Sequence, residues 1–290
     1  MTTKRKATKK SKAQRPRSAR AAMSVATSEN QVVKERVAAM AEVPLLVCES
    51  DKDLQKVLEV LRNQDEPIEV RLAALQSLQA ASFSVIAFES CRGDYIATLR
   101  KVATDPNAEL RQRVLGILAR EKDGFAIKKL LDGLKNPDKA LVPPEKALQL
   151  LSYDIHAEAY PVARAIINKP PNEDAKREAL RLLAADAKSA PVFEKLLRDK
   201  NETAEIRQVS AAALQALKPD SLQENARAIL LDDSDYDEIR ATSLTAVTQF
   251  GDEESVSKDE TLKKHVSRMS TKGGAKVKRG ARQFMSKYGK

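Results

Sequence analysis

The sequence has 290 residues, a formal net charge of +10 and a hydrophobic fraction of 42%. It has no Trp and only five Tyr and six Phe, a composition that disfavours an aromatic-lined pocket for a small molecule. The longest apolar run, 43–48, is far shorter than the roughly 20 residues of a membrane-spanning helix, and the basic N-terminus lacks the apolar core of a secretory signal. We therefore expect a cytoplasmic protein without membrane contact, or a nuclear one if the host is a eukaryote.

The positive charge is concentrated at the two ends of the chain. Residues 1–20 hold nine Lys and Arg and residues 261–290 hold ten, with no Asp or Glu in either segment. The middle, 21–260, holds the remaining 32 basic residues and all 41 acidic ones, which gives it a net charge of −9. The partners that the chain binds should depend on this asymmetry.

The N-terminal segment 1–27 combines like charge with no apolar periodicity, which predicts a basic disordered tail. Ser28 and Gln31 then fit a capping box for a helix that ends near Val43 and caps the N-terminal end of the fold. Two cysteines follow, Cys48 and Cys91, without the short spacing of metal ligands. We expect both to be reduced residues of the core, in a reducing compartment.

The segment 65–78 is the repeating unit of the chain. Pro67 suits a first helical turn, because the N–H that it lacks would have no partner there and its fixed φ matches the helix. The apolar residues that follow recur at helical spacing and form one stripe beside Arg71: Val70, Ala74, Leu75 and Leu78. A helix this short needs similar neighbours to bury its stripe.

The same stripe returns five more times along the chain, at steps of 40, 33, 32, 31 and 33 residues. The reference positions are Arg71, Arg111, Pro144, Lys176, Arg207 and Arg240. This period predicts a solenoid of helix pairs over 28–251, as one continuous body. The predicted pairs are 51–63 with 67–80, 85–103 with 107–120, 125–134 with 143–151, 156–167 with 172–185, 191–198 with 203–217, and 221–231 with 236–250.

Two further features complete the predicted elements. The long first step is explained by a break at Arg92-Gly93-Asp94, inside the first helix of the second pair. Residues 252–290 are expected to form a basic C-terminal helical cap or tail, with a helix over 252–269 and a break at Gly273-Gly274. A last helix over 275–288 then places four apolar residues on one face: Val277, Ala281, Phe284 and Tyr288.

This pattern resembles HEAT repeats, in which a turn with Asp or Asn and Pro leads into a second helix that opens on Val, Ile or Leu followed by Arg. The matching motifs are Asp65-Glu66-Pro67…Val70-Arg71, Asp105-Pro106…Leu110-Arg111, Ile206-Arg207 and Ile239-Arg240. The resemblance covers roughly residues 30 to 250. It implies an all-α fold, a right-handed α-solenoid of about six to seven helix pairs.

In that family the Asp and Arg form a hydrogen-bonded ladder between successive repeats. The resemblance implies that the ladder is complete at Asp65/Arg71 and Asp105/Arg111, and degraded at Pro144 and at Lys176. It says little about function, because such arrays serve as scaffolds, adaptors, nucleic-acid binders and a few enzymes.

The residues that catalysis would need are scarce. The two histidines, His156 and His265, lie in different repeats, and both are expected to be solvated. The HEAT-like enzyme deoxyhypusine hydroxylase binds iron through His-Glu pairs, and this sequence has no His-Glu dipeptide. No glycine-rich phosphate loop and no nucleophile with a histidine base is evident. The sequence therefore predicts no metal, no cofactor and no enzyme, with a lyase of the phycobilin type as the remaining enzymatic alternative.

The second helices of a HEAT solenoid line its inner surface, so certain positions after each reference residue should face a ligand. They form a short basic and Gln-rich stripe in an otherwise acidic body: Gln112, Arg113, Lys146, Arg177, Arg181 and Gln208. The stripe is either an ordinary solvated helix face or a groove for an acidic peptide or helix.

From these observations we expect a non-catalytic scaffold or adaptor that binds a protein partner on its concave face. The alternative is a nucleic-acid-associated protein, in which the basic ends contact DNA or RNA without sequence preference. The candidate residues are Lys4, Arg5, Lys6, Lys9, Lys10 and Lys12 in the N-terminal segment and Lys276, Lys278, Arg279 and Arg282 in the C-terminal one. The basic ends could equally serve solubility or nuclear targeting.

Overall fold

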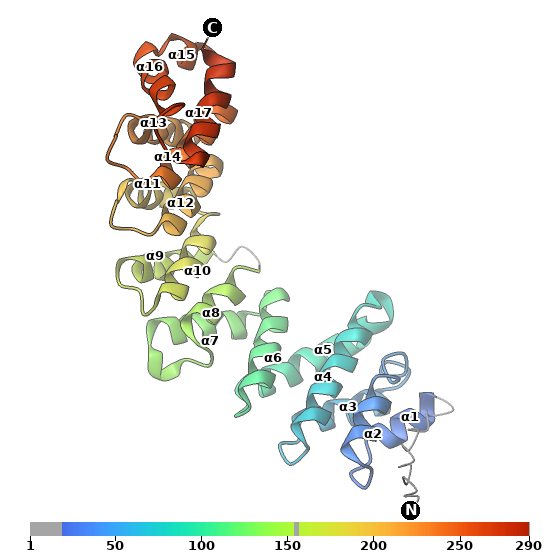
Figure 1. The fold of residues 1–290 in the computed structure, drawn as a ribbon. Coiled ribbons are helices and arrows are strands. Elements are labelled where there is room, and N and C mark those ends of the chain that lie inside the picture. Colours follow the sequence, from blue (N-terminus) through green and yellow to red (C-terminus); the bar gives the residue numbers. More distant parts are fainter. Residues whose placement is uncertain (1–18, 154–156, 290) are drawn as a thin grey trace, which may run out of the picture. The chain divides into compact units, whose positions relative to one another are not determined.

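The computed structural model of the protein describes residues 19–153 and 157–289 (Figure 1). All regular structure in these two ranges is helical, which confirms the predicted all-α class. The first helices are α1 (Ala19–Ala26), α2 (Val33–Met40), α3 (Asp51–Arg62), α4 (Ile68–Ser82), α5 (Val85–Val102), α6 (Ala108–Arg120) and α7 (Gly124–Lys135).

The later helices are α8 (Pro144–Leu151), α9 (Tyr160–Asn168), α10 (Glu173–Leu183), α11 (Ala190–Arg198), α12 (Ala204–Leu217), α13 (Pro219–Leu230), α14 (Asp237–Phe250), α15 (Glu253–Lys258), α16 (Glu260–Met269) and α17 (Ala275–Tyr288). Three short 3₁₀ helices are Pro137–Lys139, Ala157–Ala159 and Ala187–Ser189. No helix in the described ranges is long and apolar enough to span a membrane.

The described residues fall into two compact units, one that ends at Lys129 and one that begins at Leu130. The boundary falls inside α7. Within each unit, a helix packs against its partner in the pair and against the next pair, as α3, α4, α5 and α6 do in the first unit and α11 to α14 do in the second. Each unit is therefore a HEAT-like stack of helix pairs.

The residues of the predicted stripes form the core of each stack. Val70, Ala74, Leu75 and Leu78 are all buried on α4, and the equivalent residues of later repeats are equally inaccessible: Leu148, Leu180, Leu214 and Leu244. Four residues of α17 also lie in the core, as predicted: Val277, Ala281, Phe284 and Tyr288. The assignment of the repeats from the sequence is thus confirmed in register.

Two predicted features of the first unit are wrong. The tail predicted over 1–27 ends earlier, because residues 19–26 form α1, whose Ala22, Met23 and Ala26 pack in the core; residues 1–18 lie outside the described ranges. Helix α5 runs without interruption through Arg92-Gly93-Asp94. A glycine costs a helix only about 1 kcal/mol relative to alanine, and both flanking side chains are anchored, Arg92 by Glu121 and Asp94 by Gln55.

At the C-terminal end, the helix predicted over 252–269 is two helices, α15 and α16. Asp259 separates them, and its carboxylate accepts a hydrogen bond from the backbone N–H of Leu262 at the start of α16. The break at Gly273 is confirmed, since its φ of +156° favours glycine. Helix α17 then packs against α14 and α16 and closes the stack.

Buried ion pairs link successive repeats, but with partners that differ from the implied ones. Arg71 pairs with Asp105 of the next repeat, whereas Asp65 is exposed. The pairs of the same kind are Arg36 with Glu66 at 2.6 Å, Lys176 with Glu202 at 2.6 Å and Arg207 with Asp235 at 2.7 Å. The ladder therefore includes Lys176, where the resemblance implied that it is degraded. Arg111 donates to the backbone carbonyl of Asp105 at 2.6 Å.

The three arginines of this ladder share a second contact. The Nε–H of Arg36, Arg71 and Arg207 donates to the carbonyl oxygen ten residues earlier, at Ala26, Leu61 and Leu197. Each of these carbonyls lies in the last turn of the preceding helix, where it has no partner within that helix. One guanidinium thus joins the end of one helix, its own helix and the turn of the following repeat.

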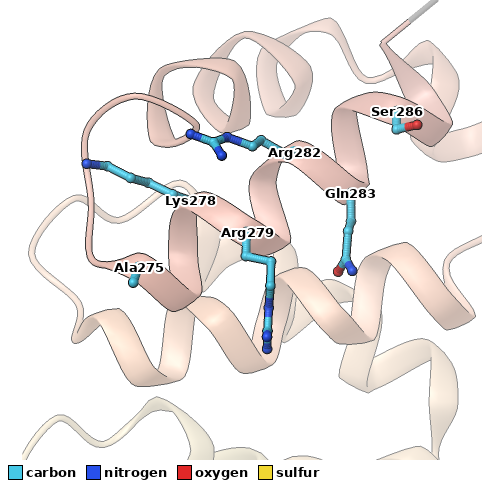
Figure 2. A pocket seen from close by; sticks show the side chains of 6 residues that line it. All are labelled: Ala275, Lys278, Arg279, Arg282, Gln283 and Ser286. Atoms are coloured by element: carbon cyan, nitrogen blue, oxygen red, sulfur yellow. The ribbon is translucent and has the colours of Figure 1, made fainter.

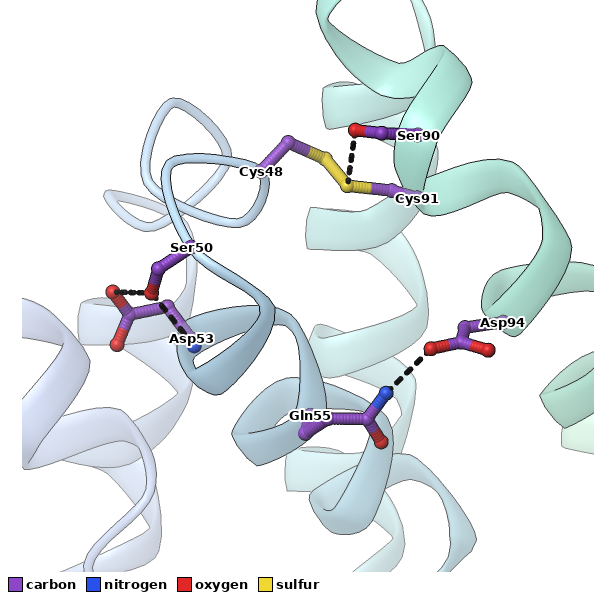
Figure 3. Close-up of a disulfide and its surroundings, with 7 residues drawn as sticks. All are labelled: Cys48, Ser50, Asp53, Gln55, Ser90, Cys91 and Asp94. Carbon is purple, nitrogen blue, oxygen red and sulfur yellow. Dashed lines mark hydrogen bonds between the residues drawn. A yellow bond between two sulfur atoms is a disulfide. The ribbon is translucent and has the colours of Figure 1, made fainter.

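A disulfide joins Cys48, in the loop before α3, to Cys91 on α5 (Figure 3). The two Cα atoms are 6.3 Å apart, within the usual range for a disulfide of roughly 4.4–6.8 Å. The expectation that both cysteines are reduced is therefore wrong, and with it the argument that they indicate a reducing compartment. Sequence spacing gave no sign that this loop returns to α5.

Replacing Cys48 and Cys91 together by serine should lower the free energy of unfolding by about 2–4 kcal/mol, because the unfolded chain regains the freedom that the crosslink removes. Urea unfolding followed by circular dichroism measures this change. Reductant should lower the stability of the parent by the same amount. Ser90→Ala, next to Cys91 and exposed, is the control and should have little effect. A parent protein whose unfolding is insensitive to reductant would contradict the crosslink.

Candidate functional site

The stripe expected on the inner surface falls in both units. Gln112 and Arg113 lie on α6 in the first unit. The remaining four lie on three helices of the second unit: Lys146 on α8, Arg177 and Arg181 on α10, and Gln208 on α12. The predicted stripe is therefore divided between the two units.

The arginines of this stripe are neutralised by neighbouring acids. Arg113 pairs with Glu109 at 2.7 Å, and Arg181 pairs with Glu178, in each case one helical turn away. Arg177 pairs with Asp174 and, at 3.2 Å, with Glu205 on α12; the Glu205 carboxylate raises the pKa of the Arg177 guanidinium. These three arginines are therefore compensated by nearby carboxylates, whereas Lys146 donates to the side-chain oxygen of Gln149 at 2.8 Å.

The C-terminal helix α17 carries the other group of candidate cations, and packing fixes its orientation. Its apolar face is fixed by burial of Val277, Ala281, Phe284 and Tyr288 against α14 and α16. Gly280 allows the close approach, since a Cβ there would lie 3.2 Å from Leu244 of α14. The opposite face of the helix is thereby held toward solvent in one orientation.

Six residues of this outer face line a pocket of about 500 Å³: Ala275, Lys278, Arg279, Arg282, Gln283 and Ser286 (Figure 2). In Figure 2, Lys278 and Arg282 extend to one side of the helix, and Arg279 and Gln283 to another. Lys276 is also exposed on the first turn. Arg282 follows Lys278 by four residues and Arg279 by three, which places these three cations away from the buried residues of α17.

These cations have no neutralising partner. Among the residues that the structure describes, Lys276, Lys278, Arg279 and Arg282 form neither an ion pair nor a side-chain hydrogen bond, and the sequence from 261 onward has no Asp or Glu. Asp237 of α14 accepts a hydrogen bond from the backbone N–H of Gly274, just before α17, and pairs with Arg240. We call these four cations, with Gln283 and Ser286, the α17 basic face.

The other candidate residues are placed as follows. Lys4, Arg5, Lys6, Lys9, Lys10, Lys12 and His156 lie outside the described ranges. His265, expected to be solvated, is only 7% exposed; its Nε2 lies 3.0 Å from Asp233 Oδ1 and its Nδ1 2.9 Å from Arg268. In the described ranges, no three His, Cys, Asp or Glu side chains are grouped as metal ligands would be.

The sequence analysis did not separate the arginines of the predicted stripe, which pair with acids, from the cations of the α17 basic face, which do not. The acids that neutralise Arg113, Arg177 and Arg181 stand three or four residues away on the same helix, so a check of helical neighbours would have found them. The contact of Glu205 with Arg177 joins two helices and needed the structure.

Comparison with known proteins gives fold-level likeness only. No family model matches the chain, and no curated protein matches it. Among solved structures, an engineered protein from a structural genomics consortium is 14% identical with a TM-score of 0.44, covering 94% of this chain and 89% of that chain. Human deoxyhypusine hydroxylase in complex with glycerol is 13% identical with a TM-score of 0.35, covering 84% of this chain and 98% of that chain.

The expectation that the chain is not an enzyme is contradicted by the second of these structures. Deoxyhypusine hydroxylase is an enzyme with a HEAT-like fold. An identity of 13% does not establish an activity for this chain.

Proposed function

We propose that the chain is a helical-repeat scaffold that binds nucleic acid through the α17 basic face. The observation that carries this proposal is the lack of compensation: four cations lie on the unburied part of a fixed helix, with Lys276, Arg279 and Arg282 exposed and Lys278 half-buried, and no acid pairs with them in the described ranges. The arginines of the predicted groove, by contrast, each pair with a neighbouring carboxylate.

Phosphates fit this surface in charge and in spacing. Residues 276 to 282 span about 9 Å of helix axis, a length over which duplex DNA carries about five phosphate charges. Lys and Arg that neutralise phosphates release condensed counterions, which gives binding without sequence preference. The two aromatic residues of α17, Phe284 and Tyr288, are buried, so bases have no exposed ring there on which to stack. Duplex should therefore bind at least as well as single strand.

Replacing Lys276, Lys278, Arg279 and Arg282 together by Gln should abolish most of this affinity. Each phosphate contact contributes about −0.9 to the slope of log affinity against log salt concentration. Four contacts therefore lower the affinity roughly 100-fold between 50 and 200 mM salt. Fluorescence anisotropy with a labelled duplex, measured across that salt range, should show the slope of the variant reduced by about three to four.

Two matched controls separate this site from general charge. A variant with Lys135, Lys169, Lys188 and Lys195 replaced by Gln has the same charge change on exposed residues of the same unit, and it should keep most of the parent affinity. A variant with Arg113, Arg177 and Arg181 replaced by Gln should also do so, because those cations are already paired. Equal losses in all three variants would show attraction to net charge alone and would rule out the proposal.

The N-terminal cations are tested by a deletion of residues 1–17, which ends before α1 begins. Removing 271–290 would be a poor experiment, since it would also remove the buried residues of α17. If the deletion abolishes binding and the α17 variant does not change it, the N-terminal segment is the binding site and the proposal fails.

A further inference from the structure

A second pocket in the same unit has the reverse charge. It has a volume of about 470 Å³ and is lined by residues of α13, the end of α14, α15 and α16, helices that pack together in the second unit (Figure 1). Its size lies in the range of roughly 300–1,000 Å³ in which binding pockets for small groups are found. None of its residues belongs to α17.

The lining combines an apolar surface with an acidic one. Val247, Val256 and Leu262 are buried side chains of the lining, and Phe250 is 54% exposed at the end of α14. The titratable residues are four acids and a single cation: Asp220, Glu224, Asp252, Asp259 and Arg227. The pocket therefore carries a net charge of about −3 when all these groups are ionised.

Two of the acids are already engaged with protein groups. Asp259 pairs with Arg227 at 2.5 Å, and this hydrogen bond lowers the pKa of Asp259 below its ordinary value. Asp252 accepts a hydrogen bond from the backbone N–H of Ser255 at the start of α15, and its hydrogen bonds with Ser255 lower its pKa. Both carboxyl groups are therefore ionised at neutral pH.

The other two acids are not compensated. Asp220 and Glu224 stand one turn apart on α13, and neither forms an ion pair or a side-chain hydrogen bond within the residues that the structure describes. Like charges at this spacing destabilise a helix by a few tenths of a kcal/mol. A bound cation would remove that repulsion.

The lining also contains Gln223, a polar side chain with one unsatisfied acceptor. Gln223 donates from Nε2 to the carbonyl oxygen of Ala246 at 3.3 Å, while its Oε1 is buried and has no hydrogen-bond partner in the described ranges. An unsatisfied buried acceptor costs about 1–3 kcal/mol.

We propose that this pocket binds a lysine or arginine side chain from a basic peptide segment of a partner protein. The long alkyl stem of such a residue would lie along Val247, Val256 and Leu262, with its charged end between Asp220 and Glu224. Phe250 offers an aromatic face for the cation. The proposal is independent of nucleic-acid binding at α17, because the two surfaces share no residue.

The test uses the whole chain and a short fluorescein-labelled peptide in which Lys and Arg alternate with Gly and Ser. Binding is measured by anisotropy at low salt. The double variant Asp220→Asn with Glu224→Gln should weaken binding about tenfold, as two exposed charge pairs together allow. Phe250→Ala should weaken it about threefold. A peptide with Glu in place of Lys and Arg should not bind.

The matched control is Glu238→Gln with Glu253→Gln, which removes two exposed acids of the same unit that do not line the pocket. It should bind the basic peptide as the parent does. An equal loss in this control, or parent-like binding by the Asp220 and Glu224 variant, would overturn the proposal. Duplex binding by that variant should not fall, which keeps this outcome distinct from the test of α17.

The basic N-terminal segment of the chain itself is the competing occupant. Deletion of residues 1–17 should leave the affinity for the added peptide unchanged if the ligand comes from a partner. A clear rise in affinity on deletion would mean that the chain's own segment competes for the pocket, and it would overturn the assignment to a partner protein.

Discussion

Replacing Asp235 by Ala should lower the free energy of unfolding of the second unit by about 3–5 kcal/mol, because it leaves a buried guanidinium without its counter-charge. Arg207 is 0% exposed, and both of its terminal nitrogens donate to the Asp235 carboxylate at 2.7 Å. The same carboxylate accepts from the backbone N–H of Tyr236. Without Asp235 the guanidinium would keep only the hydrogen bond from its Nε–H to the Leu197 carbonyl, so the loss exceeds that of an ordinary hydrogen bond.

Chemical denaturation of the intact chain measures this effect, with hydrogen exchange used to assign the change to the second unit. The control is Glu254→Ala, which breaks the exposed pair between Glu254 and Lys258 and should leave the unfolding midpoint within error of the parent. A midpoint for Asp235→Ala equal to that of the control would show that the ladder pair is solvated.

Replacing Leu180 by Asp should have a still larger effect and unfold the second unit under native conditions. Leu180 is fully buried on α10, which packs against α8, α9 and α12. The substitution loses about 1.5–3 kcal/mol of apolar burial and places a carboxylate where it has no partner, which costs several kcal/mol more. The sum approaches the whole stability of a typical domain, about 5–15 kcal/mol.

Circular dichroism and limited proteolysis test this expectation, with cleavage expected within 130–290. Thr245→Asp is the matched control, because Thr245 is exposed on α14 of the same unit. It should melt within a few degrees of the parent. A Leu180→Asp chain that melts like the parent would mean that the register of the stripes is misassigned.

The period of the stripe was enough to predict the helix pairs and their buried faces. Leu148, Leu180 and Leu244 are buried because an amphipathic helix has one way to cover its stripe in a stack. Two kinds of feature could not be predicted from this period. The bond between Cys48 and Cys91 depends on the path of a loop, and the pairing of Arg71 with Asp105 rather than Asp65 depends on how one repeat sits on the next.

The candidate sites were predictable to different degrees. The basic face of α17 follows from the charge of 261–290 and from helical spacing alone. The acidic pocket does not, because it brings together residues from four helices, among them Asp220 and Leu262. Each of these residues has an ordinary explanation in the sequence, as a helix cap, a solvated acid or a core position. Only the structure shows that these residues line the same pocket.

The arginine contacts also bear on how the ends of a stack resist fraying. In a linear array the terminal repeat has one neighbour and would be the first to detach. Arg36 binds the last carbonyl of α1 and the Glu66 carboxylate of the next repeat. Detachment of α1 and α2 would leave Glu66, a buried acid, facing the exposed end without a cation. The short helices α1 and α2 are thus held in place because their detachment would leave the Glu66 carboxylate without its partner Arg36. We therefore expect the amides of α1 and α2 to be protected from hydrogen exchange.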